Sequence, residues 1–461
     1  MIRRAMKLGA FQFLLVLPTT AVVAVVLVSA AAGLDHPSFN FGTAVTWVVW
    51  WGALLVSFLV FGRAWCLVCP IGAIGEWVQR LSLWWRSSVA AGFGFKWPRP
   101  LRGLWPATAL FVVFVFLDNG YGISNSPRMT AGLIVVLALL AAWTDLFFER
   151  RAFCRYVCPL TAFIGLNALV SMFELRQRDP VECRTGCSTK DCFRGNDTRY
   201  GCPMGEFPGG GMESNLYCIL CTECVKSCPR DNIALRFRAP GRDLWQMRHP
   251  RADGALAAAV VVGLATLVPL VTVAFLADVR YAVSRFLPAG VPPNDPPRLV
   301  AVGALFLASL GAAVGLVWGA SRLSRLAAGD RAVTTRMLFA RYAYALLPVG
   351  LAKLIADLVD HALGTLGALA DVTRALWLDF PLNRVVPARV TVVHLLGPVG
   401  VYALQIGVLL GGLVLAVYAA DRISRTLFAD RETALASFLP IAGLALLLTL
   451  ACAWTLGIPL L

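Results

Sequence analysis

Twelve of the thirteen cysteines lie between Cys66 and Cys228, and the last four form a compact run. The run reads Cys-x2-Cys-x2-Cys-x3-Cys-Pro and contains Cys218, Cys221, Cys224 and Cys228. This spacing is typical of segments that ligate 4Fe–4S clusters, and thiolates are the soft donors that such iron favours. A zinc site is the alternative, but zinc sites usually use two separated cysteine pairs. We therefore expect the run to ligate an iron–sulfur cluster.

Four more cysteines precede this run, in a stretch where Gly, Pro and charged residues replace the apolar pattern. Their spacing is wider, Cys-x3-Cys-x4-Cys-x9-Cys-Pro, and they are Cys183, Cys187, Cys192 and Cys202. In two-cluster ferredoxins the cysteine of each Cys-Pro ligates the other cluster. One 4Fe–4S cluster is therefore expected on Cys218, Cys221, Cys224 and Cys202. The second is expected on Cys183, Cys187, Cys192 and Cys228.

An internal repeat carries two further cysteine pairs. Each copy reads Arg-Ala-aromatic-Cys and ends in Val-Cys-Pro, with pairs Cys66/Cys69 and Cys154/Cys158. Each pair follows a predicted two-helix hairpin, so the four thiols converge if the hairpins pack as a pseudo-symmetric pair. They would then form a metal or cluster site, or a dithiol that cycles with a disulfide. Packing of small buried thiols is the simpler interpretation, but the repetition favours a function.

The rest of the chain is strongly apolar. Of its 461 residues, 58% are hydrophobic and 15% charged, and the mean hydropathy is +0.72. Several apolar stretches of the sequence are long enough to cross a hydrocarbon core of about 30 Å. Nine spans are predicted, at residues 10–33, 43–62, 104–122, 129–148, 254–277, 299–320, 338–360, 391–420 and 433–458. We therefore predict an all-α polytopic membrane protein with about nine transmembrane helices and an inserted two-cluster ferredoxin-like domain.

The predicted organisation has three parts. Residues 1–175 form a four-helix membrane module with the duplicated Cys-Pro hairpins, residues 176–240 the iron–sulfur domain, and residues 241–461 a five-helix membrane module.

The net charge of +15 is interpreted as a topology signal and not as a nucleic-acid site. Four loops on one side of the membrane carry 17 Lys or Arg, and the loops on the other side carry 7. This predicts that the N-terminus and all the clustered cysteines are cytoplasmic, at a bacterial cytoplasmic membrane. Because the cytoplasm is reducing, metal chemistry is favoured over disulfides.

The predicted C-terminal module contains few polar residues inside its spans. Four residues share one face of a predicted helix, Lys353, Asp357, Asp360 and His361. Ionisable residues inside spans are usually functional. His361 and His394 are expected near the outer ends of neighbouring spans. There they would ligate a haem or copper, or border a quinone pocket. The alternative is that these groups contact headgroup water and need no ligand.

The doubled Cys-Pro hairpin followed by a two-cluster domain resembles the NosR/NapH-like polytopic membrane ferredoxins, over about residues 40–240. The resemblance implies electron transfer between the quinone pool and other redox proteins, with a NapH-type carrier as the better fit. We therefore expect a relay between a soluble cytoplasmic donor or acceptor and quinone or a membrane respiratory enzyme. Two alternatives stay open. One is a membrane copper reductase that binds its substrate ion with the four repeat cysteines, and the other is a redox sensor or maturation factor.

Overall fold

The computed structural model describes residues 2–85, 92–197, 199–286, 296–330, 332–387 and 396–457. Helices form most of this part, and eight helical segments are long and apolar enough to cross a membrane. They are Phe11–Ala32, Phe41–Val60, Pro127–Phe147, Ala252–Val271, Val302–Ala328, Thr335–Val359, Pro398–Leu427 and Arg431–Gly457. The predicted class, an all-α multi-pass membrane protein, is confirmed.

One of the nine predicted spans is shorter than expected. Residues 104–122 correspond to α7 (Trp105–Tyr121), a helix of 17 residues. At 1.5 Å per residue it is about 25 Å long, which is less than the hydrocarbon core of about 30 Å. Gly122 ends the helix with a φ of +65°, a conformation that glycine adopts easily. The carboxylate of Asp118 accepts a hydrogen bond from the Ser124 N–H, at 2.7 Å, and so fixes this turn.

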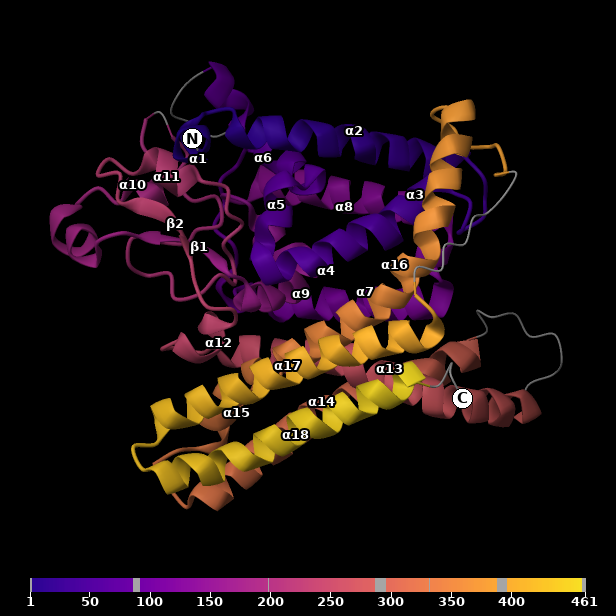
Figure 1. Cartoon of the computed structure of the whole chain (residues 1–461). Helices are drawn as coiled ribbons and strands as arrows, with labels where there is room; N and C mark the ends of the chain where they lie inside the picture. Colours follow the sequence, from indigo (N-terminus) through magenta and orange to yellow (C-terminus); the bar gives the residue numbers. More distant parts are fainter. Residues whose placement is uncertain are drawn as a thin grey trace.

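The N-terminal module consists of helices that run side by side in Figure 1. Its long helices pack α2 against α8 and α6 against α8. α8 begins at a clear start signal, because Pro127 follows Ser126, whose hydroxyl accepts a hydrogen bond from the Met129 N–H. The helices are α1 (Ile2–Lys7), α2 (Phe11–Ala32), α3 (Phe41–Thr43), α4 (Trp51–Val60), α5 (Trp65–Val68), α6 (Pro70–Trp85), α7, α8 (Pro127–Phe147) and α9 (Leu160–Asn167).

Both copies of the repeat fold in the same way around the cysteine pairs. A short helical turn carries the first cysteine, in α5 for one copy and in the π-helical segment Phe153–Val157 for the other. The second cysteine is extended, with ψ of 118° at Cys69 and 121° at Cys158. A residue before proline avoids the helical region, and proline suits the start of the next helix. α6 begins at Pro70, and α9 begins at Leu160, directly after Pro159.

The cysteine-rich insert is enclosed by two short antiparallel strands, β1 (Phe173–Gln177) and β2 (Ile233–Phe237). Phe173 pairs with Phe237 and Gln177 with Ile233. The helices of the insert are short, α10 (Asp191–Arg194) and α11 (Glu223–Ser227), and α12 (Arg242–Gln246) follows β2. The strands therefore bring the two ends of the insert together, next to the membrane module.

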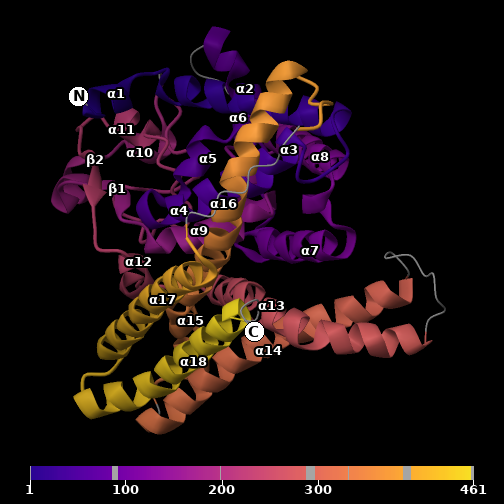
Figure 2. The same ribbon diagram turned by 45° about the vertical axis from the view of Figure 1, so that its right-hand side comes forward.

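The C-terminal module packs beside the first one (Figures 1 and 2). Its helices are α13 (Ala252–Phe286), α14 (Pro296–Ala328), α15 (Thr335–Ala345), α16 (Leu347–Leu378), α17 (Pro398–Leu427) and α18 (Arg431–Gly457). The predicted span 338–360 crosses a break at Leu346, where α15 ends and α16 begins.

α16 crosses the N-terminal module and contacts it, and the segment after α16 also connects the two modules. Leu358 of α16 lies against Gly52, where an added Cβ would be 3.1 Å from the leucine methyl group. Beyond α16, the Asn383 carbonyl accepts a hydrogen bond from the Leu34 N–H, at 3.0 Å, and its side-chain oxygen accepts one from the Phe41 N–H, at 2.6 Å.

The connections alternate between two sides of the molecule. In Figure 1 the N-terminus, the cysteine-rich insert and the turn between α17 and α18 lie at the left, and the C-terminal helix ends on the opposite side. The distribution of basic residues predicts that the insert and segment 421–431 lie on the same side of the membrane. The arrangement in the structure agrees with this prediction. Which side of a membrane this is stays a prediction, as does the division at residues 175 and 240.

Candidate functional site

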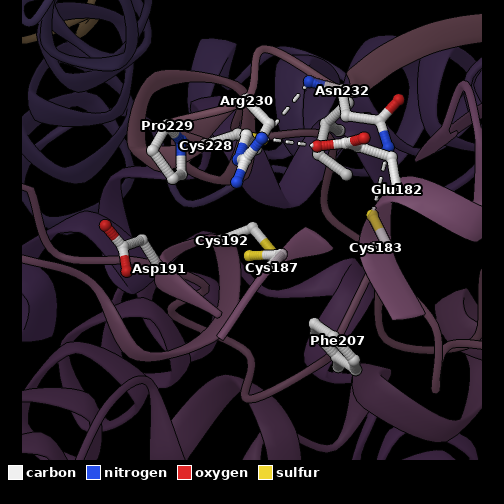
Figure 3. Close-up of a pocket in the computed structure, with 11 residues that line it drawn as sticks. Glu182, Cys183, Cys187, Asp191, Cys192, Phe207, Cys228, Pro229, Arg230 and Asn232 are labelled. Carbon is white, nitrogen blue, oxygen red and sulfur yellow. Dashed lines mark hydrogen bonds and ion pairs between the residues drawn. The ribbon is translucent and has the colours of Figure 1, made fainter. Parts of the chain in front are cut away.

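Four cysteines of the insert line one pocket near the surface, which Figure 3 shows. We name them the distal group: Cys183, Cys187, Cys192 and Cys228. Asn232 donates to two of their sulfurs, from its side-chain nitrogen to the Cys183 Sγ at 3.2 Å and from its backbone N–H to the Cys228 Sγ at 3.3 Å. At the pocket rim the Arg230 guanidinium pairs with Glu182 at 2.9 Å. The structure thus brings together the four cysteines that the crossed Cys-Pro pattern predicts for one cluster.

Four other cysteines gather deeper in the insert, and we name them the proximal group: Cys202, Cys218, Cys221 and Cys224. Burial raises the pKa of the Cys224 thiol well above its ordinary value, and the other three thiols of the group raise it further. The Glu206 N–H donates to the Cys202 Sγ at 3.3 Å. The loop curls through left-handed conformations at Leu220 and Thr222, with φ of 54° and 65°.

The proximal group rests on the second hairpin. The Arg150 guanidinium donates to the Cys202 carbonyl at 2.5 Å, and the Arg151 N–H donates to the Pro203 carbonyl at 3.1 Å. On the other side, the Thr222 hydroxyl donates to the Met6 carbonyl at 3.0 Å. The insert is therefore anchored to both the second hairpin and the N-terminal helix.

The repeat cysteines also converge. Cys66, Cys69, Cys154 and Cys158, named the repeat group, line a single cavity between α2, α4, α8 and α9. Burial, followed by the nearby Cys66 and Cys69 thiols, raises the pKa of the Cys158 thiol to about 12. The cavity has a volume of about 410 Å³ and is almost entirely apolar.

The three groups follow one another through packed side chains. One buried cluster contains Cys192 of the distal group and Cys224 of the proximal group, with Met6 beside them. Another contains Cys221 of the proximal group and Cys154 of the repeat group, with Ile219 beside them. Neighbouring groups are therefore connected without an intervening solvent layer.

The donor sets fit iron–sulfur clusters. Buried thiols with raised pKa values are protonated unless a metal replaces the proton, and a coordinating thiol is deprotonated outright. Hydrogen bonds to the sulfurs, such as those from Asn232 and Glu206, are the contacts that tune such clusters. Across the described residues, no group of three or more His, Cys, Asp or Glu side chains is arranged to hold a metal ion. Cluster ligands instead surround a larger shared space.

The predicted histidine site is not tested. The backbone of His361 lies in α16, but its side chain is outside the described part, and His394 lies outside the described residues. The neighbouring Lys353 is buried in the span, and its ammonium donates to Asp357 at 2.5 Å. Cys452 packs against Ala352 and Leu409 in the same region.

Two functional candidates were missed by the sequence reasoning, Arg63 and Arg151. Each stands three residues before the first cysteine of its repeat copy. Both are buried against the repeat group, with side chains bonded to cysteine carbonyls. The Arg-Ala-aromatic-Cys match between the two copies was the signal that could have identified them.

The chain resembles known iron–sulfur membrane proteins. A family model described as a 4Fe-4S binding domain matches residues 43–88 and 129–172. These two stretches are the two hairpins, and each contains one cysteine pair of the repeat group. The duplication is thus seen by an independent comparison.

Curated relatives are similar over part of the chain. The putative electron transport protein YccM of Escherichia coli is 28% identical over 38% of this chain and 52% of its own length. Protein NirI of Paracoccus denitrificans is 28% identical over 42% of this chain and 30% of its own length. From the same organism, the methylamine utilization ferredoxin-type protein MauN is 29% identical over 29% of this chain and 49% of its own length. The chain thus spans about half or less of these three relatives, and no solved structure matches it.

The family match, the names of the relatives and the clustered cysteines agree with the resemblance inferred from the doubled hairpin. Together they show that the chain is similar to 4Fe–4S ferredoxin-type membrane proteins.

Proposed function

We propose that this protein relays single electrons between a soluble cytoplasmic redox partner and quinone or a membrane respiratory enzyme. The distal and proximal groups would each hold one 4Fe–4S cluster, and the repeat group would hold a third iron–sulfur centre. Such centres supply one-electron couples. The protein's own contribution is to position them, to shield them from water and to set their potentials.

The observation that carries this proposal is the serial order of the three cysteine groups. The distal pocket is near the surface of the insert, where a soluble partner can approach. The proximal group lies between it and the hairpins, and each neighbouring pair of groups shares one buried cluster of side chains. The repeat group faces the interior of the membrane module. This serial order supports a relay over three independent sites.

The cavity beside the repeat group supports quinone as the membrane partner. Its volume of about 410 Å³ lies within the usual range for small-molecule sites, which are mostly apolar. Tryptophan, valine and leucine side chains contribute to its walls, and the Trp47 indole N–H donates a hydrogen bond to the Thr130 hydroxyl at 3.0 Å. A quinone ring in this cavity would contact the repeat group directly.

The copper-reductase alternative has less support. A hydrated cation would have to lose its water shell to reach the repeat group through apolar walls, and burial of an unpaired charge is costly. The lining of the cavity therefore favours an uncharged, lipophilic electron carrier over an ion.

The test uses the anaerobically purified full chain in proteoliposomes that contain quinone, with chemically reduced ferredoxin or flavodoxin outside. Quinone reduction is followed by its ultraviolet absorbance. Leu137 lines the cavity, whereas Leu139 on the same helix is 65% exposed on the lipid-facing surface. Leu137→Trp should therefore lower the rate several-fold with unchanged iron content, and the matched control Leu139→Trp should leave the rate unchanged. A wild-type protein with full iron that neither reduces nor oxidises quinone would contradict the proposal.

A further inference from the structure

Two arginines link the two copies of the repeat in a reciprocal way. The Arg63 guanidinium belongs to the first copy and donates to the Cys154 carbonyl of the second, at 3.1 Å. The Arg151 guanidinium belongs to the second copy and donates to the Cys66 carbonyl of the first, at 3.0 Å. Each arginine therefore reaches from its own hairpin to the leading cysteine of the other hairpin.

Both guanidinium groups are buried, and each residue is 1% exposed. Arg151 forms an ion pair with Glu76, which also accepts a hydrogen bond from Gln12 at 2.9 Å. Glu76 therefore supplies a negative charge beside Arg151.

Arg63 has a different environment. Its other hydrogen bond goes to the Leu216 carbonyl, at 2.8 Å, in the loop that leads to the proximal group. Among the residues that the structure describes, no carboxylate pairs with Arg63, and its Nε has no hydrogen-bond partner. Glu206 is close enough to interact with the charge of Arg63, but its carboxylate forms its ion pair with Arg155, at 3.0 Å. A buried cation without a directly paired carboxylate is unfavourable, so a further negative charge is expected nearby.

The repeat group is where that charge fits. Arg63 lines the same cavity as the four repeat thiols. Arg151 is also near this group, because a Cβ added at Gly72 would lie 2.9 Å from the Cys154 Sγ and 3.7 Å from the Arg151 Nη1. When four thiolates ligate an iron–sulfide core, their negative charge exceeds the positive charge of the core, so the centre is anionic. Four neutral thiols carry no charge.

We propose that Arg63 and Arg151 are positioning residues that hold the two cysteine pairs as one site and balance the charge of an anionic iron–sulfur centre there. The inference rests on the proposed function, because it assumes that the repeat group holds such a centre. When one electron passes from a centre on the proximal group to a centre on the repeat group, the proximal centre is oxidised and the repeat-group centre is reduced. No bond forms or breaks. The reduced site gains one negative charge, so two fixed cations stabilise it and raise its reduction potential.

The experiment is an EPR-monitored redox titration of the anaerobically purified full chain, with iron and sulfide assays. The signal of the repeat group is assigned as the one lost in Cys66→Ser and Cys154→Ser. In Arg63→Gln and Arg151→Gln, the ratio of reduced to oxidised centre at the wild-type midpoint should fall at least tenfold. For a one-electron couple this is a shift of about 59 mV to lower potential.

Two kinds of variant separate charge from structure. Arg63→Lys and Arg151→Lys keep the charge but lose the fork of donors, so their potentials should stay close to the wild-type value even where iron content falls. Arg238→Gln is the control for loss of a buried arginine, because Arg238 is 3% exposed and pairs with Asp243 in the insert, away from the repeat group. It should leave the potential of the repeat group unchanged.

The outcomes are distinguishable. If the potential of the repeat-group signal is unchanged in both Gln variants, or if Arg238→Gln shifts it by the same amount as they do, the inference is overturned. The proposed function is not affected by that result. Iron content and signals that are the same in wild type and in both Cys→Ser variants would mean that the repeat group holds no centre. That result overturns the membrane end of the proposed relay, and the inference with it.

Discussion

Gly72→Ala is a small change that should selectively damage the repeat group. Gly72 is buried in the first turn of α6, two residues after Pro70. A Cβ at this position would lie 2.9 Å from the Cys154 Sγ. This is about 0.5 Å closer than the ordinary contact distance of 3.4 Å, so the sulfur or the helix has to move by that amount. Functional groups have to be held within about 0.5 Å of their working geometry.

The expected magnitude follows from two opposing effects. Overpacking of a well-packed site costs about 1–3 kcal/mol, and replacement of glycine by alanine in a helix gains about 1 kcal/mol. The protein should therefore stay folded, with a loss of at most about 2 kcal/mol. Occupancy of the repeat group should fall, because Cys154 is displaced from its three partner thiols.

The assay is iron and sulfide content per chain together with low-temperature EPR of the reduced protein. The signals of the distal and proximal groups should persist in Gly72→Ala, and the repeat-group signal should weaken or broaden. Gly132→Ala is the matched control, because Gly132 is also helical and an added Cβ there meets nothing within 4 Å. A Gly72→Ala protein with wild-type iron content and an unaltered repeat-group signal would refute the reasoning.

Three further predictions concern the insert and the junction of the modules. Cys228→Ser should remove the EPR signal of the distal group and Cys202→Ser that of the proximal group, whereas the reverse pattern would show that the Cys-Pro ligands are not crossed. Asn232→Ala should lower the midpoint potential of the distal cluster, measured by redox titration, because it removes the side-chain hydrogen bond to Cys183; an unchanged potential would count against a tuning role. Asn383→Ala should lower stability by about 2–4 kcal/mol in detergent thermal unfolding, because it leaves an N–H unpaired and places alanine at a φ of +60°. Asn383→Gly keeps that φ accessible and should lose less; equal losses would contradict the backbone part of the argument.

The sequence predicted which cysteines gather in the insert because the relevant information is local. The run from Cys218 to Cys228 fixes most of one loop, and the two Cys-Pro steps indicate the crossing of ligands. The structure assembles the same two groups of four. Their role as ligands stays a prediction, as do the number of clusters and the histidine site.

Other features depend on packing and could not be predicted in this way. The repeat places arginines at matching positions, but their crossing to the opposite cysteine carbonyl depends on how the two hairpins face each other. The cavity beside the repeat group likewise exists only where side chains from four helices leave a space. The shortness of α7 was signalled by Asp118 inside the predicted span, yet its end is set by the turn at Gly122.

The most direct test of the central claim is low-temperature EPR of the reduced, anaerobically purified protein alongside three variants. Cys187→Ser, Cys221→Ser and Cys158→Ser each remove one sulfur from a different group. If three cysteine groups form the relay, each variant loses a different signal and retains the other two. A colourless, zinc-loaded or iron-free wild type, or three variants that all lose the same signal, would contradict the account.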